Sequence, residues 1–369
     1  MKKILFLVQL PPPIHGGSMV NQQIYDSITL NNRFCIKYID ISPAKELSDV
    51  GKINLCKLIK TFAIFFNSII GFLKVKPDLV YITLSPHGAA FYKDGIIALF
   101  LKFLGAKLVF HMHGKGVKLV VEKSKFKKII YRTVFKNVDI IHLSNKLFFD
   151  LEIVRDLSKK IFAVPNGVKP LKHLNKINNE KLTFIYLSNL VRLKGADILI
   201  RATSLMPKEY RNLFNVKIVG KQSCEQYYNE LIEIIKSNNI TNVEFCGPKY
   251  GKDKELALTS SDVFVLPTQN DCFPLSILEA MSAGLPVIST NEGAITDMVD
   301  SGLNGEIINN CTPEELASVM IKFINNRDYT RNCGMQAYKK FEHLYTNIKF
   351  EQNMANVLEL IIENNKVSI

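Results

Sequence analysis

The chain has 369 residues, of which 47% are hydrophobic and 22% are charged, with 19 Gly and 14 Pro. This length suits two domains, and the composition excludes a disordered, collagen-like or disulfide-scaffold chain. The seven cysteines stand singly without a C-x-x-C pair, which argues against a disulfide framework or zinc ribbon and favours a reducing cytosol. The formal net charge is +13. The excess of basic over acidic residues lies entirely in residues 1–170, which hold 26 Lys or Arg and 11 Asp or Glu. This bias either serves solubility or indicates an anionic partner, such as nucleic acid, a membrane surface or a phosphorylated substrate.

Short β-branched runs alternate with helical periodicity through the first half, which is typical of βα units around a parallel sheet. The apolar run at the N-terminus is too short for a signal peptide and is predicted to be a strand. The predicted strands are Ile4–Val8, Phe34–Ile39, Leu79–Thr83, Lys107–His111, Asp139–His142 and Ile161–Val164, with helices near 18–30, 53–75, 89–104, 122–136 and 145–155. The longest apolar stretch, Thr61–Leu73, is shorter than the roughly 18 residues that span a bilayer, so no membrane crossing is expected.

A polar stretch, Lys169–Glu180, interrupts this pattern and predicts a domain boundary, with one domain at residues 1–170 and the other at residues 171–369. The last helix of the chain is a candidate to return to the first domain. The predicted strands of the second domain are Thr183–Leu187, Val216–Val219, Val243–Phe245, Val263–Leu266, Pro286–Ser289 and Glu306–Ile308. A helix is predicted to start at Thr312-Pro313, which supplies an N-cap and a first-turn proline.

Two α/β halves imply a crevice between them, and open parallel sheets bind ligands beyond the carboxyl ends of their strands. The loop after the first strand contains Gly16 and Gly17 and leads into a helix. Adjacent glycines permit close backbone approach, and a helix N-terminus presents N–H groups to phosphate. Neither a dinucleotide-binding fingerprint nor a P-loop is present, so this loop is either a phosphate site or a plain tight turn.

The densest cluster of candidate residues is the segment from Asp271 to Ile288, where a loop, a short helix ended by Gly284 and a strand follow one another. Asp271 is predicted to lie in the loop and Glu279 on the helix. Carboxylates that accept sugar hydroxyls, beside backbone N–H groups that hold phosphate, would form a nucleotide-sugar site. The alternatives are a turn-forming role for Asp271 and a solvated helix position for Glu279.

This segment resembles the E-x7-E region of glycosyltransferase family 4, whose members are retaining enzymes with a GT-B fold, an α/β architecture of two Rossmann-like domains with parallel sheets that face a central cleft. Other family-like pieces occur in the right order over nearly the whole chain. They are Phe110–Gly114, Val164–Val168, Ser188–Gly195, which resembles the donor-phosphate motif G-R-L-x-x-x-K-G, and the glycine turn Asn291–Asp297.

The resemblance implies roles for individual residues. Glu279 would accept the ribose hydroxyls, Lys194 would compensate the charge of the donor diphosphate, and His113 would hydrogen-bond the donor sugar. The catalytic residues would be His113, Lys194 and Asp271, and the nucleotide-sugar site would hold Gly16, Gly17, Asn189, Arg192, Lys194, Asp271, Cys272, Phe273, Leu275 and Glu279. Two positions depart from the family pattern, because Asp271 replaces a glutamate and Asn189 an arginine. Arg192 lies near Asn189 at a different phase of the chain.

The implied activity is transfer of a sugar from a nucleotide sugar, expected to be UDP-linked, to a glycan or a polyprenyl-diphosphate-linked acceptor in capsule, O-antigen or exopolysaccharide synthesis. The first domain would bind the acceptor and the second the nucleotide sugar. No cofactor and no metal are expected: the chain lacks a D-x-D element, and the pair His111 and His113 lacks a third ligand. The alternatives are a non-transferring nucleotide-sugar epimerase and a non-catalytic lipid- or glycan-binding protein.

Basic residues crowd one predicted helix, namely Lys123, Lys125, Lys127, Lys128, Arg132 and Lys136, with Phe126, Ile129, Ile130 and Val134 on another face. A second apolar stretch, Leu55–Leu73, is flanked by Lys57, Lys60, Lys74 and Lys76. Both predict peripheral contact with anionic lipid at the inner face of the cytoplasmic membrane. The alternative is that both apolar faces pack on the sheet. Nucleic-acid binding is not expected, because interleaved aromatic residues and the known binding motifs are lacking.

Overall fold

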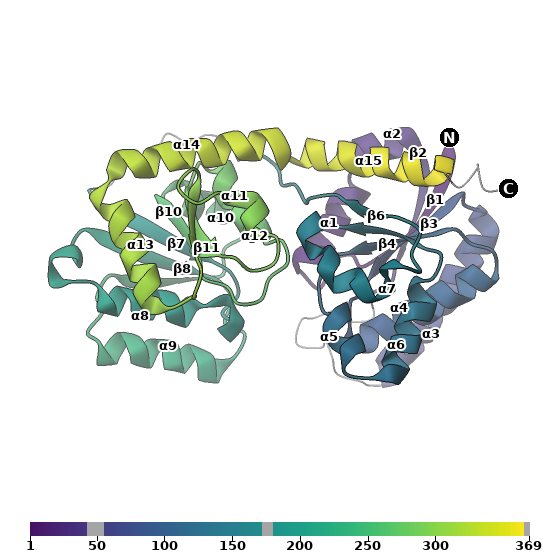
Figure 1. The fold of residues 1–369 in the computed structure, drawn as a ribbon, viewed down its shortest axis with the longest axis horizontal. Coiled ribbons are helices and arrows are strands. Elements are labelled where there is room, and N and C mark those ends of the chain that lie inside the picture. Colours follow the sequence, from purple (N-terminus) through teal and green to yellow (C-terminus); the bar gives the residue numbers. More distant parts are fainter. Residues whose placement is uncertain (43–54, 172–179, 365–369) are drawn as a thin grey trace. The chain divides into compact units, whose positions relative to one another are not determined.

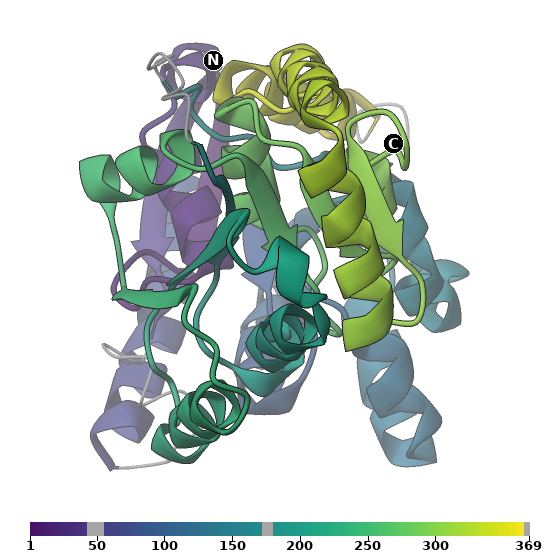
Figure 2. The same ribbon diagram turned by 90° about the vertical axis from the view of Figure 1, so that its left-hand side faces the viewer.

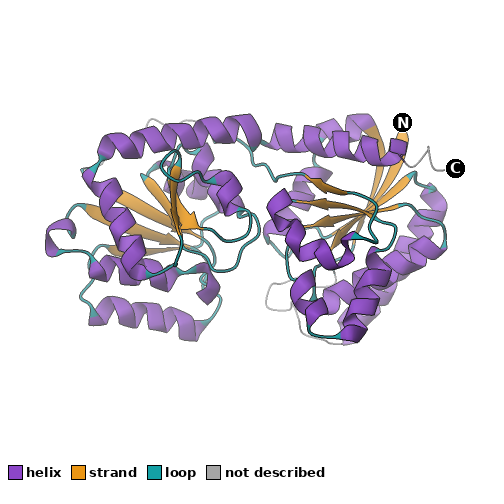
Figure 3. Cartoon of the chain, in the orientation of Figure 1, coloured by secondary structure: helices purple, strands orange, loops and turns teal. Residues whose placement is uncertain are grey.

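The computed structural model describes residues 1–42, 55–171 and 180–364, which form two α/β units (Figures 1 and 3). The first unit comprises Met1–Asn166 together with Ile348–Ile369, and the second comprises Gly167–Asn347. The division follows Asn166, a few residues before the predicted boundary at residue 170, and the last helix belongs to the first unit. Among the described residues, none of the helices combines the length and the apolar character that a membrane crossing requires.

The first unit contains a six-stranded parallel sheet in the order β2-β1-β3-β4-β5-β6. Its strands are β1 (Lys2–Val8), β2 (Phe34–Asp40), β3 (Leu79–Leu84), β4 (Leu108–Met112), β5 (Asp139–His142) and β6 (Ile161–Ala163). All six strands predicted for this half are confirmed, and their ends differ from the predicted ends by at most two residues. They were recognisable because β3, β4 and β5 are buried on both faces, so their sequences are short and mostly apolar.

The helices of the first unit are α1 (Gly16–Tyr25), α2 (Ile28–Arg33), α3 (Leu55–Val75), α4 (Gly88–Phe103), α5 (Val117–Glu122), α6 (Lys125–Phe135), the 3-10 helix η2 (Asn145–Leu151), α7 (Glu152–Arg155) and α15 (Asn347–Asn364). The helix predicted near 18–30 is divided into α1 and α2, and the helix predicted near 122–136 is confirmed as α6 from Lys125 onward. A serine cap stands at the start of both α2 and α6. Ser27 accepts from the N–H of Leu30 at 3.2 Å, and Ser124 accepts from the N–H of Lys127 at 3.4 Å. Lys123 and Lys136 therefore lie outside α6.

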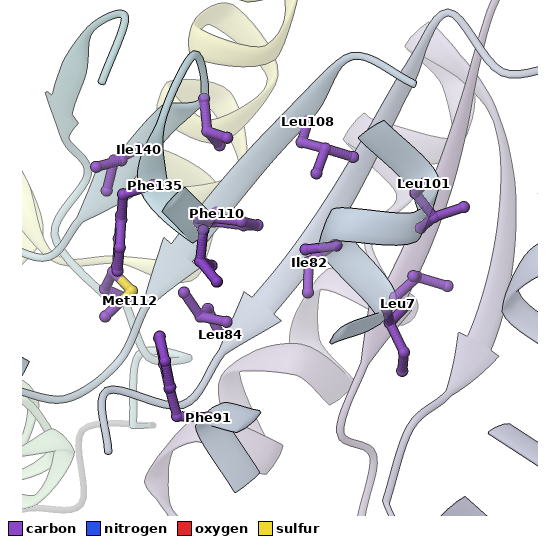
Figure 4. Packing of buried hydrophobic residues seen from close by; sticks show 14 of the residues in the cluster. Leu7, Ile82, Leu84, Phe91, Leu101, Leu108, Phe110, Met112, Phe135 and Ile140 are labelled. Carbon is purple, nitrogen blue, oxygen red and sulfur yellow. The ribbon is translucent and has the colours of Figure 1, made fainter. Parts of the chain in front are cut away.

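Helices α3 to α7 contribute to one hydrophobic core against one face of this sheet (Figure 4). The sheet contributes alternate residues, among them Leu7, Ile82 and Phe110, because successive side chains of a strand point to opposite faces. Phe91 of α4 stacks on Tyr131 of α6 with ring centroids 3.7 Å apart, which joins two of the helices. The core thus lies between the sheet and a layer formed by these helices.

Helix α15 is joined to α2 by polar contacts that span most of the sequence. The hydroxyl of Ser27, at the cap of α2, donates to the carboxylate of Glu351 at 2.6 Å in a buried position. Arg33 donates to the side chain of Asn356 at 2.7 Å. The inner face of α15 buries Phe350 and Met354, so this terminal helix is an integral part of the first unit.

The second unit contains a parallel sheet in the order β12-β11-β10-β7-β8-β9. Its strands are β7 (Leu182–Leu187), β8 (Phe214–Val219), β9 (Val243–Gly247), β10 (Val263–Leu266), β11 (Val287–Thr290) and β12 (Gly305–Ile308). Its helices are η3 (Arg192–Lys194), α8 (Ala196–Leu205), η4 (Lys208–Tyr210), α9 (Glu225–Ser237), α10 (Gly251–Thr259), α11 (Leu275–Ser282), α12 (Ile295–Met298), α13 (Pro313–Asn325) and α14 (Arg327–Leu344). Helices α8 and α13 lie side by side (Figures 1 and 2). The predicted helix start is confirmed, because Thr312 accepts from the N–H of Glu315 at 3.3 Å.

Candidate functional site

Three loops of the second unit meet at the carboxyl ends of β7, β10 and β11. The loop after β7 forms η3, and the carbonyl of Leu193 accepts from the N–H of Gln269 at 2.8 Å in the loop after β10. Gly195 follows η3 with φ of 77°, and a Cβ there would lie 2.9 Å from the carbonyl carbon of Pro267. Only glycine combines this left-handed conformation with so close a backbone approach. The first and second loops are therefore held together by glycine and by backbone hydrogen bonds.

The third loop packs against the second in the same way. Gly293 has φ of 57°, and a Cβ there would lie 2.8 Å from the carbonyl oxygen of Cys272. The N–H of Ala294 donates to the same carbonyl at 2.9 Å. The segment Asn291–Asp297, singled out in the sequence as a glycine turn, thus supports the loop that carries Asp271.

Lys194 and Asp271 form an ion pair across the first two loops. The ammonium of Lys194 donates to a carboxylate oxygen of Asp271 and to the backbone carbonyl of Asn270, the latter at 3.2 Å. The other carboxylate oxygen of Asp271 accepts from the N–H of Cys272 at 3.0 Å. Both side chains are largely buried, with 26% and 17% of their surface exposed. A cation held at the edge of a parallel sheet is suited to an anionic ligand.

Arg192 has a different carboxylate partner from Lys194, and Asn189 lies at the surface. Arg192 is bound by both carboxylate oxygens of Glu230 on α9, at 3.0 and 2.5 Å, and its guanidinium lies 4.9 Å from the ring centre of Tyr227. The side chain of Asn189 is exposed. Arg192 and Lys194, two residues apart in η3, are therefore engaged by different carboxylates.

The candidate residues of the α11 region divide into packing residues and residues that face outward. Cys272 and Phe273 are buried, and the ring of Phe273 packs edge-on against Tyr345 with ring centroids 6.0 Å apart. Leu275 opens α11 and is half-buried, and Glu279 lies one turn later. Leu275 and Glu279 therefore share one side of α11, because residues four apart in a helix lie on the same face.

Glu279 has a partner that the sequence analysis missed. The ammonium of Lys254, on α10, donates to Glu279 Oε1 at 2.6 Å, with the two side chains 30% and 20% exposed. Lys254 precedes Glu279 by 25 positions and lies on a different helix. No local pattern marks it in the sequence, so only the tertiary structure identifies it.

The first unit holds a group of histidines at the carboxyl ends of its strands. His111 lies in β4, His113 directly follows β4, and His142 ends β5. The rings of His111 and His113 have centroids 4.0 Å apart, as expected for two residues on one side of a strand. The hydroxyl of Tyr81 is hydrogen-bonded to His111 Nδ1. Within the described part of the chain, both ring nitrogens of His113 are buried without a hydrogen-bond partner.

Burial keeps these histidines neutral. It lowers the pKa of His113 to about 3, with smaller contributions from His142 and His15, and it lowers the pKa of His142 to about 3. The pKa of His111 is lowered in the same direction for the same reason. His113 can therefore donate or accept a hydrogen bond near pH 7, but it carries no charge there.

Gly16 and Gly17 begin α1 beside this group. His15 caps the helix, and its Nδ1 accepts from the N–H of Ser18 at 3.2 Å. A Cβ on Gly17 would lie 3.5 Å from the ring of His15 and 3.6 Å from the Cβ of His113. The structure therefore brings Gly17 and His113 together in the first unit, as it brings Lys194 and Asp271 together in the second. Among the described residues, no group of three or more His, Cys, Asp or Glu side chains is arranged to hold a metal ion.

Residues 170–340, which contain all of these second-unit loops, match the family model described as glycosyl transferases group 1. This match covers a little under half of the chain. The chain is also similar to named glycosyltransferases. The chain is 23% identical over 245 residues to an uncharacterised glycosyltransferase of Methanocaldococcus jannaschii, covering 66% of each chain. It is 22% identical over 269 residues to the amylovoran biosynthesis glycosyltransferase AmsK of Erwinia amylovora, covering 70% of this chain and 65% of the relative. About two thirds of the length of each of these relatives is thus matched.

Solved structures share the fold along almost the whole chain. Sucrose-phosphate synthase from Thermosynechococcus elongatus superposes with a TM-score of 0.78 at 15% identity, covering 99% of this chain and 100% of that one. The Anabaena protein HepE, solved in complex with UDP-glucose, superposes with a TM-score of 0.71 at 19% identity, covering 97% and 100%. Together with the two parallel six-stranded sheets, this likeness confirms the predicted GT-B fold of two Rossmann-like domains.

Proposed function

We propose that the protein is a retaining glycosyltransferase that moves a sugar from a nucleotide sugar to a glycan or to a polyprenyl-diphosphate-linked acceptor. The observation that carries the proposal is the set of Lys194, Asp271 and Glu279 at the carboxyl edge of the sheet in the segment that matches the group 1 glycosyl transferase model. In this proposal the second unit binds the donor and the first unit binds the acceptor.

Lys194 is proposed to bind the donor diphosphate. When the glycosidic bond breaks, the nucleoside diphosphate leaves with increased negative charge, and a cation positioned beforehand stabilises that charge. Lys194 is already held at the edge of the sheet by Asp271 and by the carbonyl of Asn270. The diphosphate would replace Asp271 as its main partner, which releases the Asp271 carboxylate to accept a sugar hydroxyl.

Glu279 is proposed to bind the ribose. Its Oε1 is held by Lys254 at 2.6 Å, so the orientation of the carboxylate is fixed while its second oxygen can accept from a ribose hydroxyl. Lys254 acts here as a positioning residue for Glu279. Arg192 and Asn189 also belong to the proposed donor site. The buried residues Cys272 and Phe273 would support it by packing, and Leu275 lies beside Glu279 on α11.

His113 is proposed to hydrogen-bond a hydroxyl of the donor sugar. Buried ring nitrogens without a partner are costly, and a hydroxyl can both donate to and accept from them. Since its pKa is about 3, His113 would act as a neutral group rather than as a cation. Gly17, which lies beside His113, and the preceding Gly16 would allow the backbone to approach the diphosphate.

A uridine diphosphate sugar is the proposed donor, and capsule, O-antigen or exopolysaccharide synthesis is the proposed setting. Two of the similar proteins support this choice, since HepE was solved with UDP-glucose bound and AmsK is named for the biosynthesis of amylovoran. No metal or cofactor is part of the proposal. A lipid-linked acceptor also calls for contact with the inner face of the cytoplasmic membrane, for which the basic first half of the chain is suited.

The first test measures binding of UDP- and GDP-linked sugars by thermal denaturation. Each sugar is tested once with magnesium and once with a chelator. A donor that binds the folded state raises the melting temperature by mass action. We expect stabilisation by a UDP-linked sugar in both conditions. Stabilisation only by the GDP series would contradict the proposed base, and dependence on magnesium would contradict metal independence.

The second test measures turnover with that donor and a set of lipid-linked and soluble acceptors. Lys194→Met is expected to lower kcat by at least about a hundredfold, as removal of a group that stabilises a developing charge does. Lys208→Met, at an exposed lysine of η4, is the matched control and should not change it. NMR of the product should show the donor's anomeric configuration. Sugar epimerisation without any acceptor would indicate an epimerase, and donor binding without turnover a binding protein.

A further inference from the structure

The outward faces of three helices in the first unit are apolar rather than polar. Exposed large apolar side chains recur every three or four residues along α3, α4 and α6. They are Ile59, Phe62, Phe66, Ile70 and Leu73 on α3, Tyr92, Ile96, Phe100 and Phe103 on α4, and Phe126 and Ile129 on α6. Phe103 is 85% exposed, Phe126 72%, and Phe62 and Phe66 58% each. We call this surface the α3–α4–α6 face.

Folding of the unit does not account for these side chains. The same helices already supply inward residues to the core, such as Ile64 from α3, Ile97 from α4 and Tyr131 from α6. A helix that is packed on a core normally carries polar residues on its other side, and contiguous exposed apolar patches mark interaction sites. The outward apolar residues are thus additional to what the core requires.

The three helices are neighbours, and ring contacts join the stripes of α3 and α4 into one surface. The ring of Phe65 on α3 packs edge-on against Phe100 on α4, with centroids 5.3 Å apart. The ammonium of Lys102 on α4 donates to the carbonyl of Val134 on α6 at 2.5 Å. Helix α4 therefore contacts both α3 and α6, and the three helices are labelled in Figure 1.

The charges on this surface have one sign. The sequences of α3, α4 and α6 contain a single acidic residue, Asp94, which is fully buried and paired with Lys93 at 2.6 Å. Exposed lysines accompany the apolar stripes, namely Lys60 and Lys74 on α3 and Lys125, Lys127 and Lys128 on α6. A second copy of this chain would bring lysines against lysines, whereas an anionic lipid surface offers charges of the opposite sign.

We propose that the α3–α4–α6 face inserts its apolar side chains into the surface layer of an anionic bilayer, while the flanking lysines contact lipid phosphates. This inference rests on the membrane contact in the proposed function. It replaces adsorption by charge with insertion of apolar side chains. Attraction by basic residues alone would leave the protein adsorbed above the headgroups, whereas exposed phenylalanine stripes reach the boundary of the acyl chains. Helices α3 and α4, rather than the basic helix α6 alone, would supply most of the buried area.

The chain contains no tryptophan, so an introduced one is a specific reporter. Phe66→Trp places it on the α3–α4–α6 face, and Met335→Trp, at a half-exposed position of α14 in the second unit, is the matched control. Full-length protein is mixed with phosphatidylcholine vesicles with and without phosphatidylglycerol, in the absence of donor and acceptor. We expect a blue shift of Phe66→Trp emission, and its quenching by brominated acyl chains, only with anionic vesicles. Met335→Trp should show neither.

Each contrary result overturns the inference. Vesicle binding without a shift at Phe66→Trp would mean adsorption by charge alone. A blue shift without lipid that grows with protein concentration, together with a dimer in size-exclusion chromatography, would mean that the face joins two copies. Absence of vesicle binding would refute lipid contact. Because no sugar is present, none of these results bears on the proposed transferase activity.

A second pair of variants measures the contribution of the apolar side chains. Phe62→Ser with Phe66→Ser should lower the vesicle partition coefficient at least about tenfold, because two exposed phenylalanines lose their transfer from water. Leu205→Ser with Met335→Ser, both at half-exposed positions of the second unit, should leave it unchanged. Circular dichroism should show both double variants folded, since the replaced side chains are outside the core. An unchanged partition coefficient for the phenylalanine variant would refute insertion.

Discussion

Gly195 provides the most direct test of how the donor loops are held together. Gly195→Ala meets two obstacles, because φ is 77° and the new Cβ would lie 2.9 Å from the carbonyl carbon of Pro267. A left-handed conformation costs a residue with a side chain about 1–2 kcal/mol. Insertion of a methyl group into packed surroundings costs a further 1–3 kcal/mol or so. We therefore expect the second unit to lose about 2–5 kcal/mol of its free energy of unfolding.

Substitution of Gly302 distinguishes the cost of the left-handed conformation from the cost of the inserted methyl group. It lies in the same unit with φ of 79°, but a Cβ there would meet nothing within 4 Å. Gly302→Ala should therefore carry the conformational cost alone, about 1–2 kcal/mol. For a domain of this size, the two variants should lower the melting temperature by about 10 °C and about 4 °C respectively. Urea denaturation and calorimetry would measure the difference.

The same pair of variants connects stability to the site. Gly195 directly follows Lys194, so a displaced loop should weaken binding of the donor nucleotide, whereas Gly302→Ala should not affect it. Equal losses of stability in the two variants would refute the strain assigned to the Pro267 carbonyl. Full donor affinity in Gly195→Ala would refute the view that this loop positions Lys194.

Three further changes test other contacts. Lys254→Met should lower donor affinity by up to about tenfold in calorimetry, because it removes the charged partner of Glu279, and unchanged affinity would contradict the positioning role. Burial lowers the pKa of His142 from 6.5 to about 3, so the unfolded chain binds a proton over that range that the native chain does not, and stability falls as the pH falls through it. In His142→Gln, the fall of the free energy of unfolding with decreasing pH should therefore be smaller by about 1.4 kcal/mol per pH unit, measured by urea denaturation between about pH 4 and about pH 6. An unchanged pH dependence would contradict the lowered pKa of His142. Ser27→Ala should cost the first unit about 1.5–3 kcal/mol in urea denaturation, because its hydroxyl bonds the buried Glu351 carboxylate, and a loss below about 0.5 kcal/mol would show that the contact is dispensable.

The strands were predictable from sequence because the physics that forms them is local. Buried parallel strands such as β3 and β10 are short apolar runs rich in β-branched residues, bounded by polar segments. Helix interruptions were harder to predict, although Ser27 and Ser124 are residues typical of N-caps and stand at the two breaks. In the predicted helix 145–155, the first part is a 3-10 helix instead. There Asp150 accepts from the N–H groups of Gly116, Val117 and Lys118 at 2.8 to 3.1 Å, a long-range contact that local periodicity does not contain.

The candidate site was predictable to the extent that glycines and charged residues follow strands. Lys194 and Asp271 are 77 positions apart, and their pairing depends on β7 and β10 being neighbours in the sheet. Sequence periodicity does not give the order of strands in a sheet. The partners Lys254 and Glu230 were missed for the same reason, since each lies on a helix that meets the site only after the sheet is assembled.

The discontinuous first unit has a consequence for synthesis of the chain. Met1–Asn166 leaves the ribosome first, yet Ile348–Ile369 of the same unit follows only after the whole second unit has been translated. At about 5–20 residues per second this delay lasts roughly 10–40 seconds. The surface that later receives Phe350 and Met354 of α15 therefore stays open to water and to chaperones during that time. The second unit, being continuous, can finish folding before the first, although its codons come later.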